Sequence, residues 1–263
     1  MADYETIRVE QTDGVVTLTL NKPDKMNAMG PEMVGEMLRV FDALPGMGAR
    51  ALVITGEGRG FSSGADLSGR TFDGGKPGDA SRRSLQNHFN PLMLALSGLD
   101  VPVVTAVNGA AAGIGCTLAL SGDLIVAGKS AYFLQAFVNI GLVPDGGATW
   151  VLPKTAGIPA AMEAMLLGER IPAERAYDLG MINRCVEDDA VMSEANALAE
   201  RLAKGPTVAI GQIRKLVRQA QGTSLSDAMN AEAEAQRIAG NSEDFVEGVT
   251  AFLGKREAQF KGR

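Results

Sequence analysis

The stretch VPVVTAVNGAAAGIGCTLALSGDLIVAG, residues 101–128, decides the fold class. Between Asp100 and Asp123 it runs for 22 residues without a charge, so we expect it to be buried. Its apolar ends, residues 101–107 and 124–127, are typical of strands, and the small residues between them predict a tight loop and a short helix. Its proline, its glycines and its many small side chains argue against a membrane span. Strand, loop, helix and strand in this order predict a layered α/β core.

The chain before this stretch has the same alternating character. Thr12-Asp13-Gly14 separates two β-rich runs and predicts a hairpin. A segment rich in Gly, Pro, Asp and Ser, residues 68–81, predicts a loop. The expected strands are residues 7–10, 15–20 and 51–55, and the expected helices are one that begins at Pro31 and one over residues 85–96.

After Thr149 the pattern becomes almost wholly helical. The expected helices are residues 160–167, 172–179, 193–203, 206–220, 225–239 and 242–256. We therefore predict a core over residues 1–195 and a C-terminal helical region over residues 196–263. Terminal helices of this kind form either an appendage or an oligomer surface, although apolar stripes also pack within one chain.

The composition is that of an ordinary globular protein: 263 residues, 46% hydrophobic and 21% charged. A net charge of −6 argues against nucleic acid and anionic lipid as partners. Cys116 and Cys185 are far apart, which suits a reducing compartment, and with His88 as the sole histidine they make no metal cluster. The N-terminal residues do not look like a signal peptide. We expect a cytoplasmic protein without a metal, a membrane or a nucleic-acid partner.

Three short motifs resemble functional loops but lack residues that the chemistry needs. The first, residues 60–64, matches G-x-S-x-G, yet a serine hydrolase of that kind needs a histidine late in the chain and a helix after the serine. His88 follows too early, and is more simply a surface or capping residue. A dinucleotide loop after residue 56 would need glycine in place of Phe61, and a P-loop ending in Gly128-Lys129-Ser130 would need glycine in place of Asp123.

Two expected strands end in loops of small residues, 61–67 and 108–115. The second loop leads into a helix start, where backbone N–H groups lack partners and the helix dipole favours negative charge. Two such N–H groups facing each other would stabilise a carbonyl oxygen as it becomes an oxyanion. Equally, the glycines could serve only tight turns and close contact between strand and helix.

These loops are two of four motifs that occur in a characteristic order. The four are Asn21-Lys22-Pro23 with Met26-Asn27-Ala28-Met29, then Phe61-Ser62-Ser63-Gly64-Ala65-Asp66-Leu67, Val107-Asn108-Gly109 with Ala112-Gly113, and Gly141-Leu142-Val143-Pro144-Asp145-Gly146-Gly147. In this order and spacing the chain resembles the crotonase (enoyl-CoA hydratase/isomerase) superfamily over essentially its whole length. Residues 133–141, 149–153 and 247–256 resemble most closely its branch of ring-epoxide isomerases in bacterial phenylacetate degradation, and enoyl-CoA Δ-isomerases are nearby.

The resemblance implies an α/β fold with a spiral core of ββα units and a C-terminal helical region that builds trimers, or hexamers as dimers of trimers. It implies an acyl-CoA substrate whose thioester oxygen meets the N–H groups of Ala65 and Ile114. No separate cofactor follows, because coenzyme A is part of the substrate. The other substrate- or CoA-binding positions that it implies are Lys25, Ser63, Asp66, Leu67, Ser68, Gly113, Thr117, Phe137, Phe252 and Lys255.

One departure from the family pattern bears on the reaction. Hydratases of this superfamily hold water between two glutamates, and the corresponding positions here are Thr117 and Phe137. The carboxylate that is left is Asp145, where isomerase-type members carry an acid; from the residues alone it could also be a helix N-cap.

We therefore predict an acyl-CoA isomerase with Asp145 as the acid/base, acting on the ring epoxide of a phenylacetyl-CoA or on an enoyl-CoA double bond. The alternatives are an atypical hydratase, a thioester hydrolase of the same fold, and a CoA-binding protein without catalysis.

Overall fold

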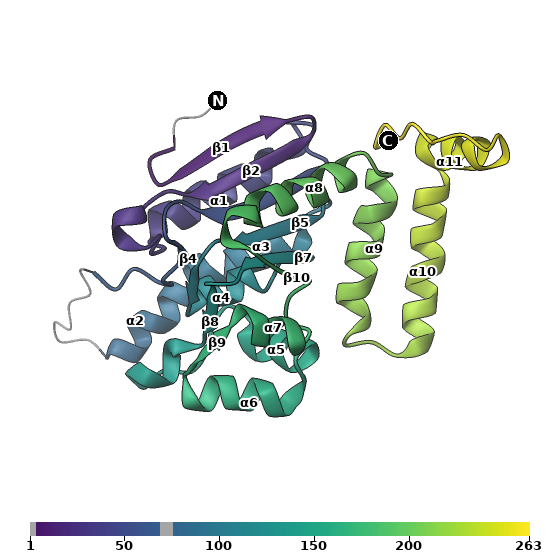
Figure 1. The fold of residues 1–263 in the computed structure, drawn as a ribbon. Helices are drawn as coiled ribbons and strands as arrows, with labels where there is room; N and C mark the ends of the chain where they lie inside the picture. The colour runs from purple at the N-terminus through teal and green to yellow at the C-terminus, as the bar shows by residue number, and fades with distance from the viewer. Residues whose placement is uncertain (1–3, 69–75) are drawn as a thin grey trace.

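The computed structural model describes residues 4–68 and 76–263, and its centre consists of two β-sheets (Figure 1). The larger sheet has the strand order β1-β2-β3-β5-β7-β10 and the smaller β4-β6-β8-β9. The strands of the larger sheet are β1 (Ile7–Thr12), β2 (Val15–Leu20), β3 (Ala51–Gly56), β5 (Val103–Val107), β7 (Leu124–Gly128) and β10 (Arg184–Val186). Those of the smaller sheet are β4 (Gly60–Ser62), β6 (Ala110–Ala112), β8 (Tyr132–Leu134) and β9 (Arg170–Pro172).

A unit of two strands and a helical segment recurs along the core. In β3–β4, β5–β6 and β7–β8 the first strand joins the larger sheet and the second joins the smaller one. Helical segments follow each pair: α2 (Pro77–Ser84), a π-helical turn (Leu85–Phe89) and α3 (Asn90–Gly98) after β4, α4 (Ile114–Ala119) after β6, and a 3-10 helix (Ala136–Ile140) with α5 (Ala148–Thr155) after β8. This spiral of ββα units confirms the expected fold. The repeat has no fixed period, because its helical parts differ in length.

Helices cover both faces of the larger sheet. The hairpin β1–β2 turns at Asp13 and Gly14, both at positive φ, and leads to α1 (Pro31–Ala43). The buried side of α1 belongs to the main apolar core with α3, and α8 (Val191–Ala203) packs on β3, β5 and β7 through a second core. The boundary that we predicted after residue 195 falls inside α8, and the division into two regions stays a prediction.

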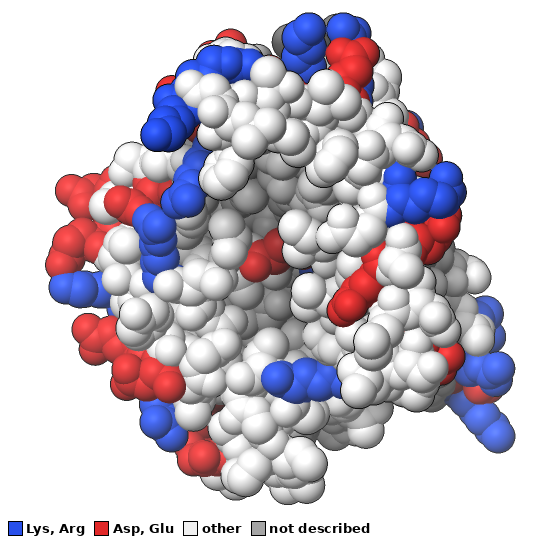
Figure 2. All heavy atoms as spheres, turned by 90° about the vertical axis from the view of Figure 1, so that its right-hand side faces the viewer, with Lys and Arg blue, Asp and Glu red and all other residues white. Residues whose placement is uncertain are grey.

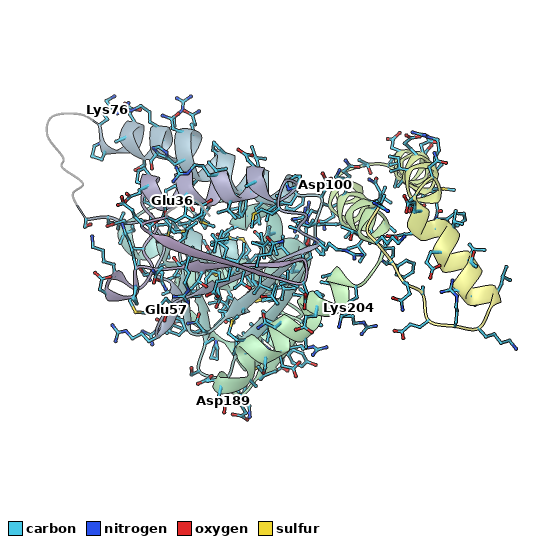
Figure 3. All side chains as sticks on the ribbon, turned by 90° about the horizontal axis from the view of Figure 1, so that it is seen from above. Glu36, Glu57, Lys76, Asp100, Asp189 and Lys204 are labelled. Atoms are coloured by element: carbon cyan, nitrogen blue, oxygen red, sulfur yellow. The ribbon has the colours of Figure 1, made fainter. Side chains whose placement is uncertain are left out.

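The remaining helices are α6 (Gly157–Leu167), α7 (Ala173–Asp178), α9 (Thr207–Ala220), α10 (Leu225–Gly240) and α11 (Glu243–Leu253). Of these, α9 and α10 lie side by side and project from the core (Figures 1 and 3). Buried Arg214 attaches α9, because its guanidinium donates 2.6 Å hydrogen bonds to the Asp123 carboxylate and to the carbonyl groups of Leu96 and Leu99. Asp100, labelled in Figure 3, pairs with Lys215 beside it.

Sequence patterns predicted the long elements better than the short ones. The loop expected over residues 68–81 is wrong from Pro77 onward, where α2 begins, and residues 69–75 lie outside the described part. Pro77 suits a helix start, because proline fits the first turn. The strands β4, β6, β9 and β10 have three residues each and exist through pairing with distant strands, which local patterns do not reveal. In the described ranges no helix is long and apolar enough to cross a membrane.

Candidate active site

The two loops of small residues lie against each other. Strands β4 and β6 pair in parallel, so the chain leaves both at the same edge of the smaller sheet. A Cβ atom on Gly64 would lie 2.8 Å from the carbonyl oxygen of Ala112 and 3.6 Å from the Cα of Gly113. Both glycines have positive φ, +99° and +54°. This contact therefore needs glycine for its backbone angles and for its closeness.

The backbone of Ala65 and Ile114 supplies two N–H groups at this contact. Met29 donates to the carbonyl of Gly64 at 2.7 Å and accepts from the N–H of Asp66 at 2.9 Å. Because successive peptide groups point to opposite sides of an extended chain, the N–H of Ala65 points away from Met29. Ile114 is the first residue of α4, so its N–H has no acceptor within the helix. The arrangement is that of two donors in adjoining loops.

Asp145 is held beside α4. The hydroxyl of Thr117 donates to the backbone carbonyl of Asp145 at 3.3 Å. Next along the chain, Gly146 has a φ of +63°, and a Cβ there would lie only 2.1 Å from the Cδ1 of Ile114. The segment therefore touches the same helix turn that presents the N–H of Ile114, and the half-buried Asp145 comes with it.

The alternative role of Asp145 as a helix N-cap is wrong. The helix that follows, α5, has Gly147 at its N-cap position. Asp145 precedes that position by two residues, and its backbone carbonyl accepts the N–H of Ala148 at 3.1 Å. Its carboxylate is thus not committed to the N-cap of α5 and remains a candidate acid/base.

The side chains of Thr117 and Phe137 are buried beside the second loop of small residues. Thr117 is fully buried in α4, and Phe137 is 8% exposed. The ring edge of Phe137 lies 3.7 Å from the place of a Cβ on Gly113, so it covers the second loop. A buried hydroxyl and an aromatic ring therefore occupy the two positions that the family likeness aligns with the water-holding glutamates of hydratases.

A polar cluster adjoins the first loop. The Asp66 carboxylate accepts the N–H and the hydroxyl of Ser68 at 2.8 and 2.5 Å and lies 3.6 Å from the ammonium of Lys25. These hydrogen bonds from Ser68, followed by the charge of Lys25, hold the pKa of Asp66 below its usual value. Ser63 donates to the carbonyl of Lys25 at 3.3 Å, and Leu67 is exposed beside them. Five predicted substrate- or CoA-binding residues thus lie together, with Asp66 as an ionised acceptor.

Phe252 and Lys255 do not reach these loops within one chain. Phe252 belongs to α11 and Lys255 follows that helix, which lies at the outer end of the helical region with α9 between it and the core (Figure 1). Phe252 is 82% exposed and lines a groove of about 780 Å³ between α9, α10 and α11. This groove is therefore far from the candidate chemistry. The face that these helices present is hollowed and mostly uncharged around the hollow (Figure 2).

Sequence reasoning gave no role to Asn27, Met29 or Gly146, which build the site. Asn27 is buried at positive φ, and its amide donates to the carbonyls of Glu57 and Gly60 at 2.9 Å. It thereby ties the motif that contains Met29 to the start of β4. The signal that could have found Gly146 is its place after a lone carboxylate, but its contact with Ile114 joins residues 32 positions apart.

Comparisons with known proteins match the whole chain. The family model described as Enoyl-CoA hydratase/isomerase matches residues 10–263. The chain is 42% identical to "1,2-epoxyphenylacetyl-CoA isomerase" of Escherichia coli (strain K12), covering 100% of both chains, and 41% identical to "Probable enoyl-CoA hydratase" of Rhodobacter capsulatus, covering 99% of both. The crystal structure of an enoyl-CoA hydratase from Polaromonas sp. JS666 matches with a TM-score of 0.91 and 32% identity, over 97% of this chain and 99% of that one.

Proposed function

The chain belongs to the enoyl-CoA hydratase/isomerase family, and on that premise we propose that it is an acyl-CoA isomerase. Members of this family are enzymes that act on CoA thioesters. One observation carries the choice of isomerase: the segment of Asp145 and Gly146 contacts Thr117 and Ile114 of α4, and by the family likeness Thr117 and Phe137 stand at the hydratase glutamate positions. The relative from Escherichia coli, named for isomerisation of a ring epoxide, supports the same choice.

In the proposed reaction the thioester oxygen accepts hydrogen bonds from the N–H groups of Ala65 and Ile114. These donors stabilise the enolate that forms when a proton leaves the carbon next to the thioester. Backbone donors fixed by packing cost no reorganisation when that charge develops. The site thus makes the α-proton acidic without a metal or another cofactor in the proposed scheme.

Asp145 then carries the proton. Its carboxylate takes the α-proton of a 3-enoyl-CoA, the electron pair spreads over the dienolate, and the same proton returns to the far carbon as the double bond moves. For a ring epoxide, the ring C–C bond that the epoxide shares breaks while both C–O bonds stay, which gives a seven-membered oxepin, and the same carboxyl group moves the α-proton to a ring carbon. Neither reaction adds or removes an atom overall.

Hydration fits the geometry less well, because water addition needs a second group to hold and activate the water. The Thr117 hydroxyl donates to a backbone carbonyl, and Phe137 presents a ring edge to Gly113. Neither side chain is a general base at neutral pH. A hydratase that uses Asp145 alone is the second candidate, and the name of the Rhodobacter capsulatus relative is its support.

We also propose that the chain assembles as a trimer or a dimer of trimers and acts in the cytoplasm. The apolar groove between α9, α10 and α11 supports assembly, because Phe245, Phe252 and Leu253 are all more than half exposed there. The distance of α11 from its own loops favours CoA contacts from Phe252 and Lys255 to a neighbouring copy.

A panel of CoA thioesters tests the reaction class. The purified protein is given a 3-enoyl-CoA, a 2-enoyl-CoA in water and the ring epoxide of phenylacetyl-CoA, and products are identified by mass and absorbance. An isomer of unchanged mass from the first or third compound is the expected result. A product heavier by one water from the second compound alone would make the protein a hydratase.

A further inference from the structure

The chain folds back on itself after α11. The Glu247 carboxylate, in the middle of that helix, accepts two hydrogen bonds from the Arg256 guanidinium, at 2.6 and 2.8 Å. It also accepts the N–H of Gln259 at 2.7 Å. These bonds hold the pKa of Glu247 at about 2, with the Arg256 hydrogen bonds as the largest cause. The carboxylate is therefore ionised at neutral pH, as its hydrogen bonds to Arg256 and Gln259 require.

Two further anchors hold the last residues. Asp244, at the start of α11 and only 2% exposed, accepts the N–H groups of Lys261 and Gly262 at 2.6 and 2.8 Å. Arg50, which precedes β3 in the core, donates to the carbonyl of Phe260 at 3.2 Å. The segment 256–263, which we call the C-terminal clasp, therefore links α11 to the core.

The Arg50 guanidinium completes that link. Its other nitrogens donate to the hydroxyl of Thr207 at 2.9 Å and to the carbonyl of Gly205 at 2.6 Å. One side chain thus joins the core, the start of α9 and the clasp. This arrangement sets where α11 stands relative to the core.

Lys255 lies between α11 and the clasp in an unusual conformation. Its φ is +51°, in the left-handed region that favours glycine. Its N–H donates to the carbonyl of Phe252 at 3.2 Å, and the N–H of Arg256 donates to that of Ala251 at 3.0 Å. This is a Schellman helix end, whose left-handed position usually carries glycine. A lysine there is a backbone outlier, and its side chain is exposed.

We propose that the C-terminal clasp is a positioning device, which holds Lys255 in this conformation so that its ammonium meets a phosphate of the CoA bound by a neighbouring copy. Glu247 and Arg256 are then positioning residues for the substrate's nucleotide end. The inference rests on the proposed function, because it needs a CoA thioester as the ligand. It gives a role to the stretch 247–256, which the proposed catalytic steps do not use.

The test compares two ligands that differ only in the nucleotide. Hexanoyl-CoA and hexanoyl-pantetheine are titrated by calorimetry into the wild-type protein and into Glu247→Gln and Arg256→Gln. The pair Glu234 and Arg237 on α10 is the matched control, because it has the same two residue types and an exposed double hydrogen bond. Glu234→Gln and Arg237→Gln are titrated in parallel, and the mass of every variant in solution is measured.

Breaking the clasp should weaken hexanoyl-CoA binding about threefold to tenfold, part of what a charge-assisted hydrogen bond contributes, and leave hexanoyl-pantetheine unchanged. The α10 controls should bind both ligands as the wild type does. Lys255→Gly should bind hexanoyl-CoA about tenfold or more weakly and hexanoyl-pantetheine as the wild type does. It should also melt at a higher temperature, because glycine suits the left-handed position.

Each other outcome has a definite meaning. Folded clasp variants that bind hexanoyl-CoA as the wild type does, or that lose affinity equally for both ligands, would overturn the positioning role. A wild type with equal affinity for both ligands would overturn it too, while leaving the isomerase proposal intact. A wild type that binds neither ligand would contradict the proposed function itself.

Discussion

The loops at Ala65, Ile114 and Asp145 and the helices α9–α11 differ in how completely one chain packs them. In the loops, glycine Cα atoms touch neighbouring backbone and side chains, so that an added methyl group on Gly64 or Gly146 has no room. On the helices, Phe252 is 82% exposed and Leu253 75%. The loops are packed by residues of the same chain, whereas the helices α9–α11 expose apolar surface that a neighbouring copy would cover.

This difference in packing indicates different functions for the loops and the helices. The loops offer backbone N–H groups whose direction is fixed by packing, which suits stabilisation of a charge that appears at one point. The helices offer side chains over a wide groove, which suits assembly and contact with the outer part of a long ligand. Substitutions in the loops should therefore change turnover at constant mass, and those on the helices should change mass or affinity.

The largest effect is expected at Asp145. Asp145→Asn keeps the shape of the side chain but removes the base, so kcat should fall about 10²–10⁴-fold with little change in melting temperature. Steady-state kinetics with the substrate that the panel identifies, together with the mass in solution, measures this.

Asp66→Asn is the comparison variant, because that carboxylate binds Ser68 and Lys25 beside the first loop. It should raise KM more than it lowers kcat. Near wild-type kcat in Asp145→Asn would mean that another group moves the proton.

The next largest effect is expected at the N–H of Ile114. Ile114→Pro removes that donor at the first position of α4, where proline fits the helix. Loss of one oxyanion donor lowers kcat about 10²–10³-fold. Ile114→Ala keeps the donor but removes a buried side chain from the main core, so it should lower the melting temperature while kcat of the folded protein stays within about tenfold of the wild type. A folded proline variant with full kcat would remove Ile114 from the proposed oxyanion hole.

Sequence predicts an element well when interactions between residues close in the chain form it, and poorly when contacts between distant residues form it. The Asp13-Gly14 turn and the apolar stripe of α1, with Met33, Met37 and Phe41, are local signals, and both elements were found. The strand Ala110–Ala112 has no such signal, because three alanines gain strand structure only by pairing with β4 and β8.

The site divides in the same way. The two loops and Asp145 were singled out from motifs, whereas the closeness of Gly64 to Gly113 depends on strands 50 residues apart in the chain. The sequence could not predict the outer position of α11 either, because helical periodicity shows which face of a helix is apolar but not what covers that face.

A smaller effect is expected on the helices. Leu253→Ser removes an exposed apolar side chain from the groove, which should weaken assembly by about 1.5–3 kcal/mol per copy, roughly tenfold to a hundredfold in the association constant. Light scattering over a range of concentrations measures the mass. Leu225→Ser, at the opposite end of α10 and outside the groove, is the control. A wild type that is monomeric at every concentration would contradict the division between the two regions.

The smallest effect is expected at Thr117, where the two readings of the site differ most. Thr117→Val keeps the volume but removes the 3.3 Å hydrogen bond to the Asp145 carbonyl. That carbonyl still accepts the N–H of Ala148, so no buried acceptor is left unsatisfied and the loss should stay near the low end for a neutral hydrogen bond, about 0.5–1.5 kcal/mol. If the protein is an isomerase in which Thr117 only positions Asp145, kcat of the variant should fall about twofold to tenfold and KM should not change. A loss beyond about a hundredfold would mean that the hydroxyl itself handles substrate or water, which would favour the hydratase instead.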